Sequence, residues 1–201
     1  VDSIDVCDPG PKRVRNGAGV SGVAGDVVGN GRHHGGTSQA VYAVAAEELA
    51  WWSAELGIDL APGCFAENLT LTGLDVDSAL VGERWQVGDT VVLQVTGPRV
   101  PCHTFRGAIG VPGWVKRFSE RGRTGAYLAV VTPGTIRPGD EITIAFRPDH
   151  AVTVPLLYRA VTSDPRWADE ALAAREYLDP ELAEKLTRRA TYGLDAEPGS
   201  L

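Results

Sequence analysis

Residues 88–105 read GDTVVLQVTGPRVPCHTF, a strand pattern that leads into a cysteine held between prolines. Gly88 and Asp89 form a turn signal, and the β-branched residues that follow favour an extended chain over 90–97. Pro98 and Pro101 then restrict the backbone on both sides of the next segment. The stretch therefore predicts a strand followed by a stiff loop that carries Cys102.

The same pattern of short strands and turn residues recurs along the chain. Residues 139–144, GDEITI, repeat the Gly-Asp turn and the strand that follows it at 88–93. Further strands are predicted over residues 3–6, 22–28, 67–73, 83–87, 125–134, 140–147 and 151–154. Many short strands separated by Gly, Pro, Asn and Asp are typical of a barrel or a sandwich. We therefore expect a mainly β fold, with a β-barrel over residues 1–155.

Helices are predicted in two places. Residues 37–57 carry apolar side chains at helical spacing, with Thr37 or Ser38 to cap the start and Gly57 to end the helix. After Pro155, two Asp-Pro pairs at 164–165 and 179–180 each offer an N-cap followed by proline at the first helical position. The pattern predicts one prominent amphipathic helix, a helical extension of about three short helices over 156–192, and a disordered tail over 193–201.

Composition narrows the class of protein. The chain has 201 residues, a formal net charge of -7 and a pI near 5.1, which disfavours a nucleic-acid polymer as partner. No run approaches the roughly 20 apolar residues of a membrane span, and no apolar signal core follows a basic start. Three cysteines cannot all pair within one chain, so a reducing cytoplasm is the expected location.

Cys102 is the strongest candidate for chemistry. Arg99, His103 and Arg106 are close in sequence, and positive charge lowers the pKa of a thiol. A thiolate is a nucleophile, a sulfur acceptor and a soft metal ligand. The alternative reading, a buried and inert cysteine, stays open on spacing alone.

Two further segments carry polar residues in unusual positions. Residues 32–44, RHHGGTSQAVYAV, place His33 and His34 before two glycines; in an extended segment they would point to opposite sides, and one would face a pocket. Residues 62–75, PGCFAENLTLTGLD, place Glu67 and Asn68 in an apolar strand, with one side chain directed into a cavity. Packed loop histidines and a solvated Glu67 remain the alternatives, and Cys64 is read as a small buried hydrophobe.

Four segments in order resemble the MOSC domain, the module named from the C-terminal part of molybdenum-cofactor sulfurases. They are GVAGDVVGNGRHHGGTSQAVYAV (22–44), PGCFAENLTLTGLDVDSALVGERWQVGD (62–89), VVLQVTGPRVPCHTF (91–105) and GRTGAYLAVVTPGTIRPGDEI (122–142). The resemblance is strongest to stand-alone bacterial MOSC proteins, whose C-terminal end carries three helices. It implies that Cys102 ligates molybdenum. It also implies that the pocket is lined by His33, His34, Glu67, Asn68 and Arg99, with Arg123 on the cofactor's phosphate. Ala66 departs from the family pattern, which has a glycine at this position.

The function implied is reduction of N-hydroxylated compounds, such as hydroxylaminopurine-type bases, at a molybdenum cofactor (Mo-molybdopterin). Cys102 would hold the metal, and Glu67 or a histidine such as His34 would deliver the proton that releases water. Electrons would come from an external reductase, because we find no flavin, haem or iron–sulfur motif in this sequence. A homodimer is left open. Two rival readings are a sulfur or cofactor carrier acting through a Cys102 persulfide, and a non-catalytic binding module.

Overall fold

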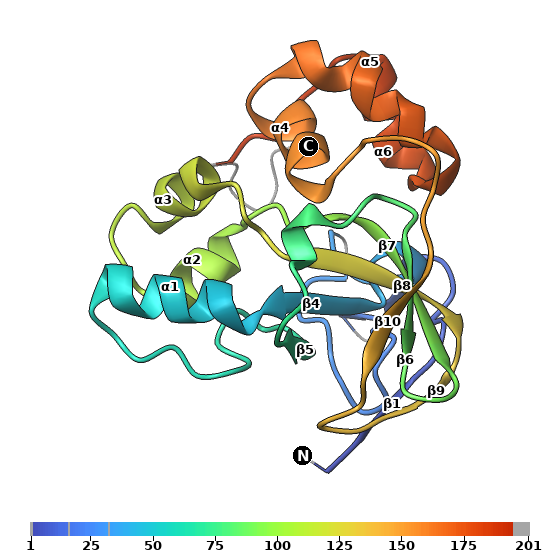
Figure 1. Ribbon diagram of the computed structural model, residues 1–201. Helices are drawn as coiled ribbons and strands as arrows, with labels where there is room; N and C mark the ends of the chain where they lie inside the picture. Colours follow the sequence, from blue (N-terminus) through green and yellow to red (C-terminus); the bar gives the residue numbers. More distant parts are fainter. Residues whose placement is uncertain (1, 16, 32, 195–201) are drawn as a thin grey trace.

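A six-stranded mixed sheet forms the centre of the fold (Figure 1). The computed structural model describes residues 2–15, 17–31 and 33–194. The strands follow the order β10-β6-β7-β8-β4-β5, and two-stranded ladders β1-β9 and β2-β3 lie beside them. Their bounds are β1 Ile4–Val6, β2 Val14–Arg15, β3 Ala18–Gly19, β4 Val41–Ala45, β5 Leu69–Leu71, β6 Arg84–Val87, β7 Val91–Pro98, β8 Ala126–Thr132, β9 Gly134–Ile136 and β10 Ile142–Phe146. The mixed sheet forms a half-barrel, and several helices pack around it. Helices account for more of the chain than strands do.

The opening stretch of the sequence forms the strand that it predicts. β7 pairs with β6 on one side and β8 on the other, both antiparallel, and buries Val91, Leu93 and Val95. Each of the two Gly-Asp turns leads into a strand, the first into β7 and the second into β10. These two strands lie on opposite sides of β6. Gly88 and Gly139 both adopt positive φ, of 54° and 90°, which glycine reaches at little cost.

The helix predicted over 37–57 is wrong for its first half. Residues Thr37–Gln39 form a 3-10 turn (η1), Val41–Ala45 form β4, and only Ala46–Leu56 are helical (α1). β4 pairs with β5 in parallel and with β8 antiparallel, and all five of its residues are buried. A strand that is covered on both faces is apolar at every position. Such a run also satisfies the spacing expected of a helix face, so the helical pattern over these residues was accidental. Gly57 ends α1 in the left-handed conformation, as predicted.

Two predicted strands are also wrong, and two helices were missed. Residues 22–28 form turns with isolated bridges at Val23 and Val28, and residues 151–154 contribute one bridge at Thr153 before a helix begins. The missed helices are α2 (His103–Ile109) and α3 (Trp114–Arg121). They pack their aromatic residues onto α1 and β4 in a cluster that contains Trp52, Phe65, Phe105, Trp114 and Phe118. The two helices have only seven and eight residues, so each offers too few turns for helical periodicity to be recognised in the sequence.

The C-terminal helices form a layer at one end of the sheet (Figure 1). They comprise α4 Val154–Thr162, η3 Pro165–Trp167, α5 Ala168–Ala171, η4 Leu172–Tyr177 and α6 Pro180–Thr187. Asp164 and Asp179 cap η3 and α6 through their side chains, each followed by proline, as predicted. The layer has its own apolar core, and the Tyr177 ring occupies the space above Gly82. The tail predicted over 193–201 lies outside the described residues from 195 onward.

None of the helices in the described ranges is long and apolar enough to cross a bilayer.

Candidate functional site

Cys102 lies where β7 gives way to α2. Pro98 is the last residue of β7, and Cys102 is the N-cap of α2 with extended dihedral angles, φ -117° and ψ 170°. Its carbonyl accepts the hydrogen bond from the amide of Arg106 that closes the first turn of the helix, at 3.0 Å. The central strand and a helix start therefore position this thiol together.

The thiol of Cys102 is acidic although it is half-buried. Burial by itself raises its pKa, but several interactions act in the opposite direction. A hydrogen bond from His34, the backbone amide of Phe105, and the positive charges of His34 and Arg99 together lower the pKa of Cys102 to about 6. At neutral pH the side chain is a thiolate, which is the reactive and metal-binding form.

The two adjacent histidines differ in their surroundings. The amides of His33 and His34 both donate to the carbonyl of Asn30, at 3.3 and 3.1 Å, so the segment is a turn rather than an extended strand. The side chain of His33 is exposed, whereas that of His34 is half-buried and hydrogen-bonds to Cys102. The structure therefore brings His34, and not His33, to the thiol.

Arg99 is a half-buried cation next to the same thiol. Its Cζ lies 4.2 Å from the centre of the Phe105 ring and 4.9 Å from that of Tyr42, and its Nη1 donates to the carbonyl of Phe65 at 2.6 Å. Its Nε is buried without a hydrogen-bond partner, and no carboxylate pairs with it within the described ranges. Burial lowers the pKa of Arg99, but Tyr127, Tyr42 and Cys102 raise it above the usual value, so the guanidinium remains charged. A desolvated cation with a free donor is an arrangement that favours an anionic ligand.

Glu67 is buried and its carboxylate is occupied by its own loop. It accepts hydrogen bonds from the amide of Gly63 at 2.5 Å, the amide of Phe65 at 2.9 Å and the hydroxyl of Thr70 at 2.9 Å. Ala66, within this loop, has a φ of 57°, a conformation that favours glycine. Glu67 thus holds the loop whose Phe65 carbonyl receives Arg99.

Asn68 joins the same loop to β4. Its side-chain Oδ1 accepts a hydrogen bond from the backbone amide of Tyr42 at 2.9 Å. Its backbone amide donates to the carbonyl of Tyr42, also at 2.9 Å. Its Nδ2 donates to Asp26 at 3.3 Å. Asn68 therefore extends the parallel ladder between β4 and β5 by one step and connects it to the glycine-rich segment before His34.

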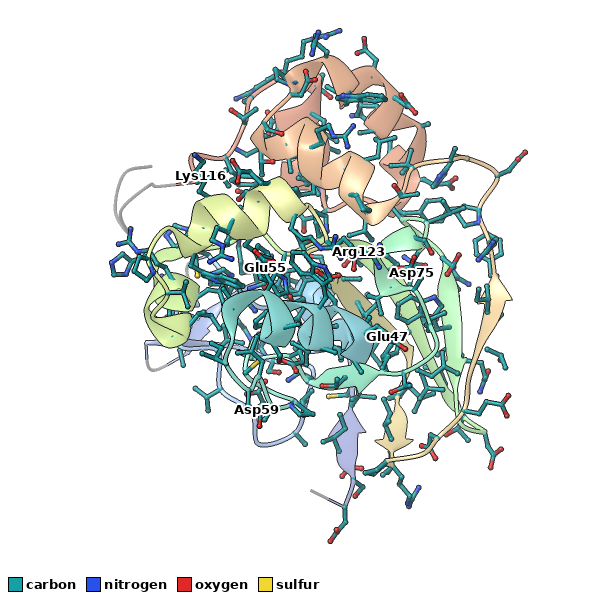
Figure 2. The ribbon with its side chains drawn as sticks, turned by 60° about the vertical axis from the view of Figure 1, so that its left-hand side comes forward. Glu47, Glu55, Asp59, Asp75, Lys116 and Arg123 are labelled. Carbon is teal, nitrogen blue, oxygen red and sulfur yellow. The ribbon has the colours of Figure 1, made fainter. Side chains whose placement is uncertain are left out.

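Arg123 lies in a different environment from Arg99. Figure 2 shows it next to Asp75; its Nη2 contacts that carboxylate, and its Nε donates to the buried Glu48 at 3.0 Å. It borders a cleft of about 640 Å³ between α3 and α4 whose lining includes none of Cys102, His34 and Arg99. The structure does not bring Arg123 to the thiol.

Sequence reasoning missed the aromatic walls of the site. The rings of Tyr42 and Phe105 lie next to the Arg99 guanidinium, and the carbonyl of Phe65 accepts a hydrogen bond from it. Tyr127 packs against Tyr42 with ring centres 5.2 Å apart and the ring planes tilted by 43°. Tyr42 fell in the wrongly predicted half of the helix, and the phenylalanines read as ordinary core, so the sequence contained no separate signal for them. In the described part of the chain, no three His, Cys, Asp or Glu side chains converge as a metal site.

A sequence model of the MOSC domain matches residues 30–143, a span that includes His34, Arg99 and Cys102. The chain belongs to the MOSC domain family. This confirms the resemblance seen in the sequence. The MOSC protein is 32% identical to the uncharacterised protein YflK of Bacillus subtilis over 127 residues, 63% of this chain and 57% of that protein. It is also 32% identical to a protein named Reductase from Gibberella moniliformis over 131 residues, 64% of this chain and 23% of that protein.

Solved structures show the same fold for the MOSC protein. YiiM from Geobacillus stearothermophilus superposes with a TM-score of 0.72 at 23% identity, covering 94% of this chain and 97% of that one. YiiM from Escherichia coli gives 0.68 at 20% identity, covering 92% of each chain. In the sequence comparisons, by contrast, the matched segment covers only about half the length of YflK and of E. coli YiiM, and about a quarter of the fungal protein.

Proposed function

We propose that this MOSC protein binds a molybdenum cofactor through Cys102 and reduces N-hydroxylated compounds. The observation that carries the proposal is the acidic thiol of Cys102, whose pKa is lowered by a hydrogen bond from His34 and by the positive charges of His34 and Arg99. A single thiolate is sufficient for a cofactor that brings sulfur ligands of its own, and Cys is a soft ligand.

The residues around the thiol fit an anionic group of this kind. The unpartnered Nε of Arg99 is a buried donor that a negatively charged cofactor would satisfy. Cys102 would be the metal ligand, Arg99 would balance charge, and Tyr42 and Phe105 would exclude water around it. The bound cofactor would supply two-electron redox chemistry.

The reaction is balanced as R–NHOH + 2 electrons + 2 H⁺ giving R–NH₂ and H₂O. His34 is the better candidate for delivering a proton, because it contacts Cys102 directly while all three hydrogen bonds of Glu67 go to its own loop. The electrons would come from a separate reductase. The cytoplasm remains the expected location.

The first experiment measures molybdenum in protein expressed in a cofactor-producing host. Wild type should contain close to one molybdenum per chain, and Cys102→Ser should contain none. Cys64→Ser is the matched control, because Cys64 is also half-buried beside the same aromatic cluster, and it should retain the metal. Metal absent from wild type, or present equally in Cys102→Ser, would contradict the proposal.

A second candidate function is sulfur carriage by a Cys102 persulfide. The low pKa and partial exposure of this thiol favour it, since thiolates accept sulfur from a persulfide donor by exchange of thiolate for thiolate. A mass increase of one sulfur on Cys102 in protein without molybdenum would support carriage and replace the reductase proposal. A third outcome, neither metal nor persulfide, would indicate a non-catalytic module.

A further inference from the structure

One buried peptide unit connects a carboxylate to an aromatic wall of the site. The amide of Gly125 donates to Oδ1 of Asp77 at 3.0 Å. The carbonyl of Thr124, in the same peptide unit, accepts a hydrogen bond from the hydroxyl of Tyr42 at 2.6 Å. The side chains of Asp77 and Tyr42 are buried, at 1% and 3% exposure. Because both bonds are made to one rigid, polarised group, each strengthens the other.

The carboxylate, the peptide unit and the tyrosine come from three separate elements. Asp77 lies in the 3-10 turn η2 (Val76–Ser78), the peptide unit directly precedes β8, and Tyr42 lies in β4. A Cβ on Gly125 would lie 2.5 Å from the carbonyl oxygen of Ala43 and 3.1 Å from Cε2 of Tyr42. The peptide unit therefore packs closely against β4, and its position helps to fix that of the Tyr42 ring.

The Tyr42 ring in turn forms one wall around the guanidinium of Arg99. Cζ of Arg99 lies 4.9 Å from the centre of the Tyr42 ring and 4.2 Å from that of Phe105. Nη1 of Arg99 donates to the carbonyl of Phe65, while its Nε is buried without a hydrogen-bond partner among the described residues. A guanidinium that packs on ring faces takes its orientation from them, so a shift of Tyr42 would change the direction of Nε.

We propose that Asp77 is a positioning residue that, through this peptide unit, holds the Tyr42 ring against Arg99 and so directs Nε toward an anionic ligand. Arg123 supports Asp77 from its other oxygen, since Nη2 of Arg123 lies 3.8 Å from Oδ2 of Asp77. The inference rests on the proposed function only in taking Arg99 as the group that faces the anion. It is tested on protein without cofactor, so its failure would leave the molybdenum measurement unaffected.

The test compares Asp77→Ala with wild type and measures hydrogen exchange of the Arg99 Nε–H group by NMR. The signal is assigned by its absence in Arg99→Lys. We expect its exchange rate to rise about tenfold, the consequence of losing one buried hydrogen bond, and its chemical shift to move with the Tyr42 ring. The amides of the β6–β7 ladder report opening of the whole fold and should change by about twofold or less.

Three further variants separate positioning from a general loss of stability. Asp75→Asn is the matched control, because Asp75 directly precedes η2 and contacts the same Arg123, and it should leave the Arg99 rate unchanged. Asp77→Asn keeps Oδ1 as an acceptor and should restore slow exchange. Tyr42→Phe removes the other bond to the peptide unit and should also raise the rate about tenfold. Adding Asp77→Ala to it should cause no further rise, since both changes break one connected path.

The proposal is overturned if the Arg99 rate, relative to the ladder amides, does not change in Asp77→Ala. It is equally overturned if Asp75→Asn raises that rate as much, or if Asp77→Asn exchanges as fast as Asp77→Ala. Additive effects of Asp77→Ala and Tyr42→Phe would show that the two bonds act separately, which also contradicts it. If Asp77→Ala does not fold, Asp77→Ser, with a side chain one atom shorter than that of Asp77, is held to the same criteria.

Discussion

Cys64 and Cys102 contact the same aromatic cluster and are both half-buried, yet their thiols have opposite acidities. Burial and the negative charge of Glu67 raise the pKa of Cys64 to about 11. Burial also acts on Cys102, but His34, the amide of Phe105 and Arg99 lower its pKa to about 6. Charge and hydrogen bonding around a thiol, rather than its depth, therefore decide which of two similar cysteines is reactive.

The largest expected effect is the difference in reactivity between these two thiols. At pH 7 Cys102 is mostly ionised, whereas about one Cys64 in ten thousand is. The weaker intrinsic nucleophilicity of the more acidic thiolate offsets about half of this on a logarithmic scale. We expect iodoacetamide to modify Cys102 about 100-fold faster, measured by mass spectrometry of each peptide. Equal rates would remove the contrast on which the site assignment rests.

Neutralising Glu67 tests whether its charge raises the pKa of Cys64. Glu67→Gln removes the charge that raises the pKa of Cys64, so this pKa should fall. It also weakens three hydrogen bonds of a buried carboxylate, and we expect the free energy of unfolding to fall by about 2 kcal/mol in urea titration. Glu55→Gln, at an exposed ion pair of α1, is the control and should change stability by less than about 1 kcal/mol. If the free energy of unfolding and the pKa of Cys64 both stay unchanged in Glu67→Gln, Glu67 neither stabilises the fold nor raises that pKa.

Removing the histidine beside Cys102 should bring the two thiols closer in acidity. In His34→Ala the hydrogen bond and positive charge that lower the pKa of Cys102 are lost, while burial still raises it. We expect the midpoint of the alkylation–pH profile to rise by about one unit, which lowers the rate at pH 5 about threefold once the stronger nucleophilicity of the less acidic thiolate is included. His33→Ala changes the exposed neighbour and should leave the profile unchanged; identical shifts in both variants would contradict the role given to His34.

The smallest expected effect concerns the loop that carries Cys64. Ala66 has a φ of 57°, which costs an L-residue energy that glycine does not spend. Since glycine also loses more entropy on folding, Ala66→Gly should stabilise the protein by less than about 1 kcal/mol, with little effect on either thiol. A rise in the thermal midpoint of a few degrees would agree with this. A lower midpoint would show that contacts of the methyl group outweigh the backbone strain.

The sequence predicted the backbone around Cys102 better than the side chains that surround it. The strand before Cys102, its prolines and the cationic residues near it were visible, because each depends on local spacing. Among the cations that it nominated, Arg99 is half-buried and has no carboxylate partner among the described residues, whereas Arg123 is paired with Glu48 and Asp75. Glu48 lies 75 residues and Asp75 lies 48 residues from Arg123 in sequence, so nothing near Arg123 indicated them.

By itself, the sequence determined the features that arise from neighbouring residues. These are the alternating strand β7, the Gly-Asp turns, the Asp-Pro starts of η3 and α6, and the end of α1 at Gly57. Only the tertiary structure decided that Val41–Ala45 is a central strand, and that His34 rather than His33 faces Cys102. The physical reason is that strand pairing, burial and the pKa of a thiol depend on groups that are distant in sequence. Local patterns restrict backbone conformation, but long-range packing determines which side chains meet.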